Sequence, residues 1–252
     1  MQFSSKKKTL SIKKLFIILI ALFLISTLPS FSLFFTSQEE YELGKEAAKE
    51  YEQKYGLCES PSLKRQLNSV SKELTKVAPN TKEVNYIFKV SCDEEPNAVS
   101  FPGGFIYITS GLYKIPDFDD NQLACILGHE MMHIIKRHSM KRLERDLGVN
   151  IIIQLALGKK ENIKKLTSLS KDLLILKYSR EQELEADRGG MLLAYKAGYN
   201  PAGLIIFFQT LMKLEKSNSP HASYIIANHP HLETRIEKAK EVLAEIQKDS
   251  LH

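Results

Sequence analysis

The stretch of residues 123–139 constrains the fold of this chain more than any other, because it places two histidines one helical turn apart. It reads LACILGHEMMHIIKRHS, contains no proline and repeats apolar residues at helical spacing. Residues four apart lie on one face of a helix, so His129 and His133 can offer imidazole nitrogens to one ion. Glu130 is rotated by about 100° from His129, which suits a group beside the ion better than a ligand.

This pattern is typical of a zinc site with one open position. Zinc held by two imidazoles and one carboxylate keeps a fourth position for water and lowers the pKa of that water, and Glu130 can take the proton. The pattern would arise by chance in roughly two of a hundred sequences of this composition. A helix that carries these side chains without a metal is the alternative, so a third ligand is needed elsewhere in the chain.

The segment YSREQELEADRGG, residues 178–190, offers candidates for that third ligand. Its expected helix start carries four acidic residues, which are Glu181, Glu183, Glu185 and Asp187. Glu183 and Asp187 share one helix face by the four-residue spacing, and Glu181 and Glu185 share another. Periodicity does not choose between the two pairs, and an ordinary solvated helix face would carry the same charges.

Residues 1–36 have the composition of a targeting segment. The basic stretch KKKTLSIKK precedes an apolar run, LFIILIALFLISTL, as in a secretory signal peptide. If the helix continues through Phe35, it reaches the roughly 20 residues of an uncleaved membrane anchor. The residues do not separate these two readings. In either case we expect residues 37–252 to be exported, to the periplasm or the outer face of the cytoplasmic membrane. A buried core helix is disfavoured, because the run has no polar face.

Charge and cysteines narrow the class further. The net charge is +5, but the lysines of the first fourteen residues supply it, so the nearly neutral body does not indicate a nucleic-acid surface. Export permits a disulfide, and Cys58 and Cys92 are the plausible pair because both flank expected loops. Cys125 lies in an apolar helical stretch and is expected to be buried.

The order of the expected elements predicts an α+β domain. Amphipathic helices cover residues 37–56, with Ser37 as the cap, and residues 60–80. Aromatic and β-branched residues between Val84 and Ile115 predict a small sheet. The rest is mostly helical, with breaks at Gly158, 198–201, 217–220 and 229–230. Within the sheet, PNAVSFPGGFIYI fits either a plain hairpin or an edge that binds extended peptides. The residues that would shape such an edge are Asn97, Ala98, Gly103 and Gly104.

Five stretches, in order, resemble the HtpX/BepA-like and CAAX-prenyl-protease-like zinc metalloendopeptidases. They are NAVSFPGGFIYITSGL, GHEMMH, YSREQELEADRGG, AGYNPAGLIIFFQTLM and NHPHLETRIEKA. The resemblance implies a mostly helical zincin domain of the gluzincin type over residues 37–252, with a small sheet beside the H-E-x-x-H helix and one zinc ion per chain. Without multiple spans or a helical-repeat tail, the chain resembles a stand-alone exported catalytic domain.

The resemblance also implies roles for single residues. Glu183 becomes the third zinc ligand, Asp187 hydrogen-bonds a zinc-bound histidine, and the other two acidic residues face solvent. His229 and Arg235 would lie near the catalytic centre. There His229 either assists the reaction or occupies the open zinc position at rest, with a surface His-Pro turn as the alternative. Further histidines without an expected metal role are His138, which would lie off the ligand face, His221, His231 and His252.

These expectations point to a zinc endopeptidase of the cell envelope that cleaves exposed or misfolded proteins. Its partners would be unfolded polypeptides and, if the first segment is not cleaved, the membrane; nucleic acid is not expected. The alternative is a zinc-bound chaperone or assembly factor whose proteolysis is held off by His229. A metal-free, membrane-tethered interaction protein is the third reading.

Overall fold

The computed structural model describes residues 35–79, 84–146, 173, 177–217, 226, 229 and 231–249. Residues 36–252 form one compact unit, separate from residues 1–35. The predicted signal or anchor lies outside the described residues, as do the break expected at Gly158 and the side chains of Pro230, His221 and His252. No helix within the described ranges is long and apolar enough to cross a membrane.

Helix α2 (Ser37–Tyr55) begins with a capping box that differs by one residue from the expected cap. Thr36, not Ser37, is the N-cap: its hydroxyl accepts from the backbone N–H of Glu39, whose carboxylate accepts from the backbone N–H of Thr36. Ser37 is the first helical residue because the reciprocal pair needs a glutamate three positions after the cap. Gly56 ends the helix at a φ of 71°.

The predicted disulfide is confirmed. Cys58, just after α2, is bonded to Cys92, just after β1 (Ile87–Ser91), so the bond ties the end of the first helix to the sheet. Cys125 is buried, as predicted, and burial raises the pKa of its thiol to about 12. It therefore stays a neutral thiol at ordinary pH.

The predicted small sheet is confirmed, and it is mixed. Strand β3 (Phe105–Thr109) lies in the centre, parallel to β1 and antiparallel to β2 (Ala98–Phe101), which forms one edge. A single turn, η1 (Pro102–Gly104), joins β2 to β3. β2 and β3 thus form a hairpin whose first strand lies at an edge of the sheet, where an extended peptide could be added.

The two faces of the sheet contact different helices. Tyr107 of β3 lies against Tyr51 of α2, with ring centroids 4.9 Å apart, whereas Ile106 belongs to the core shared with α3 and α4. Side chains alternate along a strand, so Ser100, which pairs with Ile106 across the sheet, also faces α4. This alternation directs one polar residue of the edge strand at the H-E-x-x-H helix.

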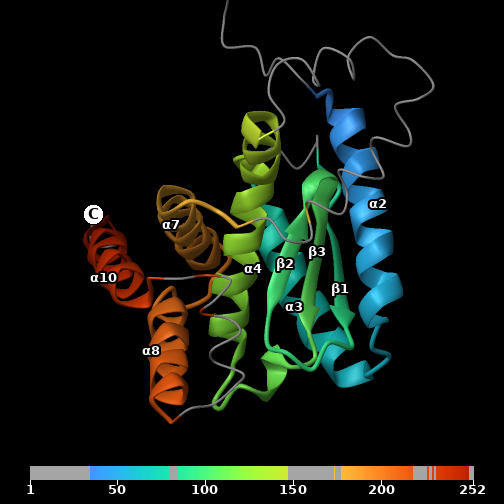
Figure 1. The fold of residues 1–252 in the computed structure, drawn as a ribbon. Coiled ribbons are helices and arrows are strands. Elements are labelled where there is room, and N and C mark those ends of the chain that lie inside the picture. The colour runs from blue at the N-terminus through green and yellow to red at the C-terminus, as the bar shows by residue number, and fades with distance from the viewer. Residues whose placement is uncertain are drawn as a thin grey trace, which may run out of the picture. The chain divides into compact units, whose positions relative to one another are not determined.

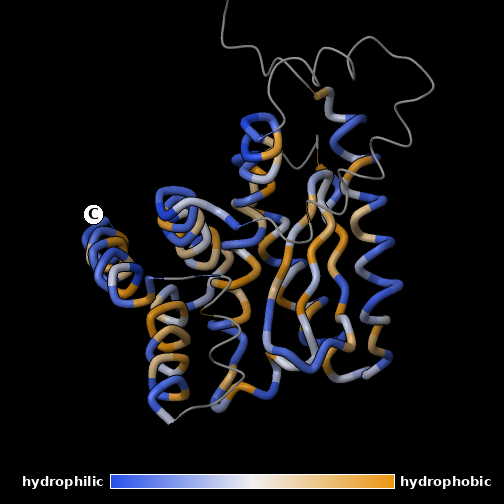
Figure 2. The backbone as a smooth tube through the Cα atoms, viewed as in Figure 1, coloured by the Kyte–Doolittle hydropathy of each residue, from blue (hydrophilic) through white to orange (hydrophobic). Residues whose placement is uncertain are grey.

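The expected helices surround the H-E-x-x-H helix, which is α4. In Figure 1, α4 lies between the sheet on one side and α7, α8 and α10 on the other. Figure 2 shows that β1 and β3 are mostly apolar, whereas α2 is largely hydrophilic. The remaining elements are α3 (Pro61–Val77), η2 (Leu112–Lys114), α4 (Asp120–Ile135), α7 (Arg180–Lys196), α8 (Gly203–Lys216) and α10 (Leu232–Asp249). Breaks fall between α7 and α8 and directly after α8, as expected. The prediction of an α+β fold is confirmed.

One expected helix is interrupted. The sequence predicts a continuous helix through His138, but α4 ends at Ile135 and Arg137 has a φ of 55°. A second helical stretch, residues 138–146, begins directly after this turn. The left-handed residue changes the direction of the chain, and this change decides where His138 points.

Candidate metal centre

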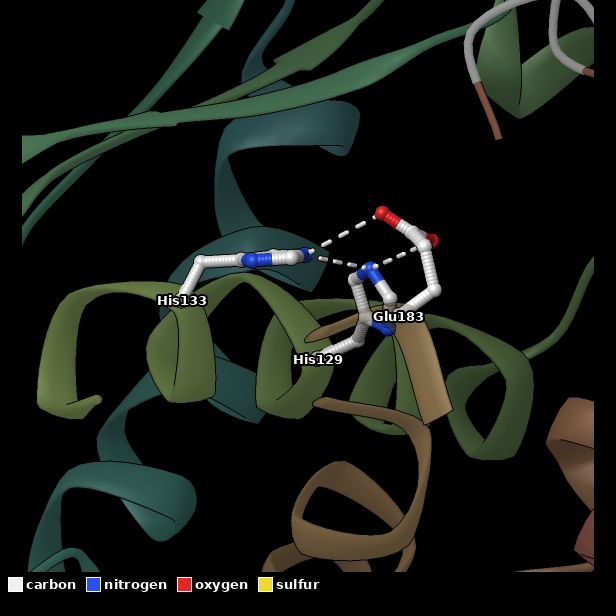
Figure 3. A group of neighbouring side chains, drawn as sticks. All are labelled: His129, His133 and Glu183. Atoms are coloured by element: carbon white, nitrogen blue, oxygen red, sulfur yellow. Dashed lines mark hydrogen bonds and ion pairs between the residues drawn. The ribbon is translucent and has the colours of Figure 1, made fainter. Parts of the chain in front are cut away.

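Three side chains from α4 and α7 meet in one buried group. The Nε2 atoms of His129 and His133 are 2.9 Å apart, and the Glu183 oxygens lie 3.6 Å from the first and 3.7 Å from the second (Figure 3). Within the described part of the chain, these three residues form the one group of three or more His, Cys, Asp or Glu side chains whose potential ligand atoms all lie within 4.8 Å of one another. The four-residue spacing places the histidines side by side, and packing between helices brings in the glutamate.

A pair of glycines allows this packing. A Cβ atom at Gly128 would lie 2.7 Å from the carbonyl oxygen of Gly190, and a Cβ at Gly190 would lie 2.5 Å from the backbone nitrogen of His129. Both contacts are too short for any side chain. Gly128 and Gly190 therefore let α4 and α7 approach closely enough for Glu183 to reach the two histidines.

The geometry fits a zinc ion. Zinc bonds of about 2.0–2.1 Å in a tetrahedral site separate neighbouring ligand atoms by about 3.3 Å, and the three observed separations bracket that value. Glu183 Oε1 is buried and accepts no hydrogen bond within the described structure. A buried carboxylate oxygen without a donor is costly unless a cation satisfies it, so this atom indicates a metal position.

His229 and Arg235, which contact Glu183 Oε2, keep the carboxyl group of Glu183 ionised. Glu183 Oε2 forms an ion pair with Arg235 Nη1 at 2.8 Å and contacts His229 Nδ1 at 3.1 Å. Burial acts to raise the pKa of Glu183, but the charges of His229 and Arg235 hold it well below its usual range. The group therefore presents a carboxylate, as a zinc ligand must.

Asp187 orients the other side of His129. Its Oδ1 lies 2.9 Å from His129 Nδ1, so the Nδ1–H donates to the carboxylate and Nε2 is left free for a metal. Arg235 donates two hydrogen bonds to the same carboxylate, from Nε at 2.7 Å and from Nη2 at 2.6 Å. Burial opposes ionisation of Asp187, but the charge and hydrogen bonds of Arg235 lower its pKa. Glu181 and Glu185 are exposed, as expected.

Glu130 is buried beside the metal group but is not part of it. Its Oε2 accepts a 2.6 Å hydrogen bond from Ser100 Oγ on the edge strand β2. Sequence reasoning missed Ser100. The alternation of β2 carried the signal, because it directs Ser100 to the same face as Ala98, but only the sheet register shows that α4 covers that face.

Two further residues surround His133: Tyr178, which sequence reasoning missed, and His138, which it expected to have no metal role. The ring of Tyr178 stacks on the His133 ring at a centroid distance of 3.7 Å, with a hydroxyl 2.8 Å from Ser139 Oγ. His138 Nδ1 lies 2.9 Å from His133 Nδ1. The sequence placed His138 off the ligand face, and the turn at Arg137 folds it back onto the Nδ1 side of His133, opposite the Nε2 that faces the metal group. It is not part of the group of His129, His133 and Glu183.

A pocket of about 420 Å³, counting the space at its mouth, lies beside His129 and Glu130. Its wall includes Asn97, Ala98, His229 and Arg235. The rest of the wall is apolar and consists of Leu112, Ile126, Leu204, Phe207, Phe208 and Leu232. The expected edge residues therefore divide into two groups. Asn97 and Ala98 reach the pocket, whereas Gly103 and Gly104, with φ of 79° and 108°, form the turn at the other end of β2.

Comparison with known proteins identifies the family. Residues 59–243 match the sequence pattern of peptidase family M48. The chain is 28% identical over 211 residues to the mitochondrial metalloendopeptidase OMA1 of Schizosaccharomyces pombe, which covers 82% of this chain and 62% of that protein. It is 25% identical over 215 residues to the beta-barrel assembly-enhancing protease of Escherichia coli, and the match covers 80% of this chain and 43% of that protein. It is 32% identical over 157 residues to the metalloprotease LoiP of Escherichia coli, and the match covers 60% of this chain and 59% of that protein.

The chain thus spans roughly half the length of these curated relatives, by the same coverage. The matched region includes the edge strand, the H-E-x-x-H helix, the helix that carries Glu183 and most of α10. A family match over most of the chain agrees with a buried His-His-Glu group of zincin type. The chain belongs to peptidase family M48.

Proposed function

We propose that the protein is a zinc metalloendopeptidase of the cell envelope that hydrolyses exposed or misfolded proteins. One zinc ion per chain would be held by His129, His133 and Glu183. The observation that carries the proposal is this buried three-ligand group, with the unused oxygen of Glu183 inside it and a separate glutamate, Glu130, beside it. A purely structural zinc site would have four protein ligands, whereas three leave room for a reactant.

Zinc in such a site supplies a Lewis acid that polarises the scissile carbonyl and lowers the pKa of water. Glu130 takes the proton from the attacking water and passes it to the leaving amine. The hydrogen bond from Ser100 orients the Glu130 carboxylate and leaves its other oxygen free for this transfer.

His229 is the better candidate for stabilising the oxyanion. Its side chain is 17% exposed and lines the pocket, so it can reach a substrate carbonyl. The side chain of Arg235 is 3% exposed, its Nε and Nη2 donate to Asp187, and its Nη1 forms an ion pair with Glu183. We assign Arg235 to positioning these two carboxylates.

Two features of the site support extended, unfolded polypeptides as substrates. The edge strand β2 can accept main-chain hydrogen bonds from an added strand without much demand on sequence. Asn97 and Ala98 connect this edge to the pocket, whose wall is mostly apolar, and Gly103 and Gly104 form the turn that ends it. Unfolded proteins expose both extended backbone and large apolar side chains. The relatives' names, which describe metalloendopeptidases and an assembly-enhancing protease, agree with polypeptide substrates.

An exported location is supported by two independent features. Residues 1–36 have the basic and apolar pattern of a signal peptide or an anchor. The disulfide between Cys58 and Cys92 is typical of an oxidising compartment such as the periplasm.

Digestion of unfolded casein, with zinc analysis of the same preparation, tests the proposal. We expect about one zinc ion per chain, cleavage of casein, loss of cleavage with a chelator and its return on adding zinc. The cleavage sites, mapped by mass spectrometry, should place a large apolar residue at one constant position relative to the cut. Zinc-loaded protein that cleaves no unfolded substrate would refute the proposal.

A zinc-bound chaperone or assembly factor is the second candidate, and one observation favours it. His229 contacts Glu183 at 3.1 Å, and its ring centroid is 5.6 Å from that of His129, so it lies close enough to restrict the open side of the group. The Glu130→Gln protein separates the two functions. If the protein is a chaperone, Glu130→Gln should still suppress aggregation of an unfolded client. If it is only a peptidase, the same variant should neither cleave the client nor suppress its aggregation.

A further inference from the structure

We propose that His138 and Glu185 form a hydrogen-bonded relay that positions the ligand His133, so that zinc affinity depends on a hydrogen-bond acceptor at the protein surface. The relay runs from His133 Nδ1 to His138 Nδ1 at 2.9 Å, and from His138 Nε2 to Glu185 Oε2 at 3.1 Å. The inference rests on the zinc site of the proposed function. It assigns a positioning role to two residues that lie outside the metal group.

The hydrogens in this chain of contacts have one consistent arrangement. His133 Nε2 faces the metal group, so as a ligand it carries no hydrogen there and its hydrogen lies on Nδ1. His138 Nδ1 must then accept that hydrogen. A neutral His138 with an acceptor at Nδ1 carries its hydrogen on Nε2, which donates to Glu185. Each contact therefore has one donor and one acceptor, and the last acceptor is a carboxylate.

The turn after α4 builds the relay. Arg137, with its φ of 55°, brings His138 back against His133, and the side chains of these two histidines are 1% exposed or less. Glu185 comes from α7 and is 45% exposed. Lys136, from the same turn, holds the other oxygen of Glu185 at 2.6 Å. The turn thus brings His138 to His133 and supplies Lys136, which contacts the exposed end of the relay.

The two ligand histidines are held by different acceptors. His129 donates directly to Asp187, a buried carboxylate that Arg235 fixes, whereas His133 donates to a neutral imidazole. Tyr178 stacks on His133 with an angle of 16° between the rings. Stacking fixes the plane of the ring but not its rotation within that plane. The hydrogen bond to His138 fixes this rotation and therefore the direction of Nε2.

A purely structural role for His138 is the competing explanation, since a buried histidine is often only a hydrogen-bonded core residue. Two substitutions of similar shape separate the roles. In His138→Asn, the amide oxygen can take the place of Nδ1 and accept from His133. In His138→Leu, the side chain fills similar space but accepts nothing. If only the packing of His138 matters, both variants should lose zinc affinity. If the hydrogen-bond acceptor matters, only His138→Leu should lose it.

Zinc affinity, measured by competition with a chelator of known affinity, tests the relay without any assay of peptidase activity. We expect His138→Leu to bind zinc about 10–100-fold more weakly, as for loss of other partners of metal ligands. His138→Asn should recover most of this loss. Urea unfolding of the zinc-free proteins checks that both variants fold.

Glu185, at the exposed end of the relay, provides a second pair of substitutions, which keeps the test valid if a His138 variant does not fold. Glu185→Gln retains an oxygen that accepts from His138, whereas Glu185→Ala does not, so only alanine should weaken zinc binding. Equal affinities in all variants would overturn the relay, and so would equal losses in His138→Asn and His138→Leu. A wild-type protein that binds no zinc would instead refute the zinc site and with it the proposed function.

Discussion

Replacing Arg235 by methionine tests the ion pairs that hold the site together. Its guanidinium donates to Asp187 at 2.6 and 2.7 Å and forms an ion pair with Glu183 at 2.8 Å, and all three side chains are at most 4% exposed. Breaking a buried ion pair from one side costs about 3–5 kcal/mol, because the remaining charge stays buried without a partner. Here one substitution leaves two carboxylates, so we expect a loss near the upper end of that range in zinc-free protein.

Urea unfolding in the presence of a chelator measures this loss, since bound zinc would compensate the charge of Glu183. The matched variants are Arg235→Met, Asp187→Asn and the double substitution. The Asp187→Asn change removes one of the two stranded charges, so the double variant should be more stable than the sum of the single losses predicts, by about 1–3 kcal/mol. This coupling energy isolates the Arg235–Asp187 interaction from the packing of the arginine on Phe208.

The pH dependence has a definite sign. The pKa values of Asp187 and Glu183 are lowered in the folded protein, so their ionised forms stabilise it above the unfolded pKa values. That stability is lost as the pH falls through the folded pKa values. The difference between wild type and Arg235→Met should therefore be full at pH 7 and shrink towards and below about pH 4.

Three results would refute this reasoning. A loss below about 1 kcal/mol would mean that the pairs contribute no more than exposed ones. Additive losses in the double variant would show that Arg235 and Asp187 are not coupled. A stability difference that stays constant from neutral to acidic pH would exclude the two carboxylates as its source.

Four further predictions concern the site itself. Glu130→Gln should retain zinc but hydrolyse casein about 10²–10⁴-fold more slowly, because an amide cannot take the proton; equal rates at equal zinc content would contradict the role of general base. Ser100→Ala should keep its zinc and lose less activity than Glu130→Gln, since only the orientation of the base is disturbed, and kinetics showing an equal loss would assign Ser100 a larger role. Glu183→Gln should empty the site in metal analysis, whereas Glu185→Gln should retain about one ion per chain; the opposite result would move the third ligand. His229→Ala should cleave casein about 10²–10³-fold more slowly at equal zinc content, as for loss of one oxyanion donor, and faster cleavage would instead show that His229 blocks the site at rest.

The part of the site that lies within one helix follows from the sequence alone. The spacing of His129 and His133 fixes them on one face of a helix, and the offset of Glu130 separates it from the ligands. The capping glutamate of α2 and the alternation of the strands are equally local. These features depend on contacts between residues a few positions apart, which backbone geometry determines wherever the segment is placed. The strands of the small sheet and the breaks around α8 could be predicted for the same reason. The disulfide joins residues 34 positions apart and was predicted on other grounds, namely export and the expected loops beside both cysteines.

The choice among the acidic residues could not be made from local spacing. Glu183 and Glu185 lie on different faces of α7, and periodicity treats both faces alike. The close approach of Gly128 and Gly190 decides which face meets α4, because only glycines allow the two backbones so near each other. The resemblance to a known family identified Glu183, and the packing of α7 on α4 supplies the physical reason.

His138, Ser100 and Arg235 show what tertiary structure alone decided. Five residues after His133, a continuous helix would turn His138 away, but one left-handed residue at Arg137 brings it back to hydrogen-bonding distance. Ser100 reaches Glu130 only because β2 pairs with β3 in a register that directs it at α4. Arg235 reaches two carboxylates about fifty residues earlier in the chain. Such contacts join segments whose separation in sequence carries no information on their distance in space, so they are determined only when the core packs.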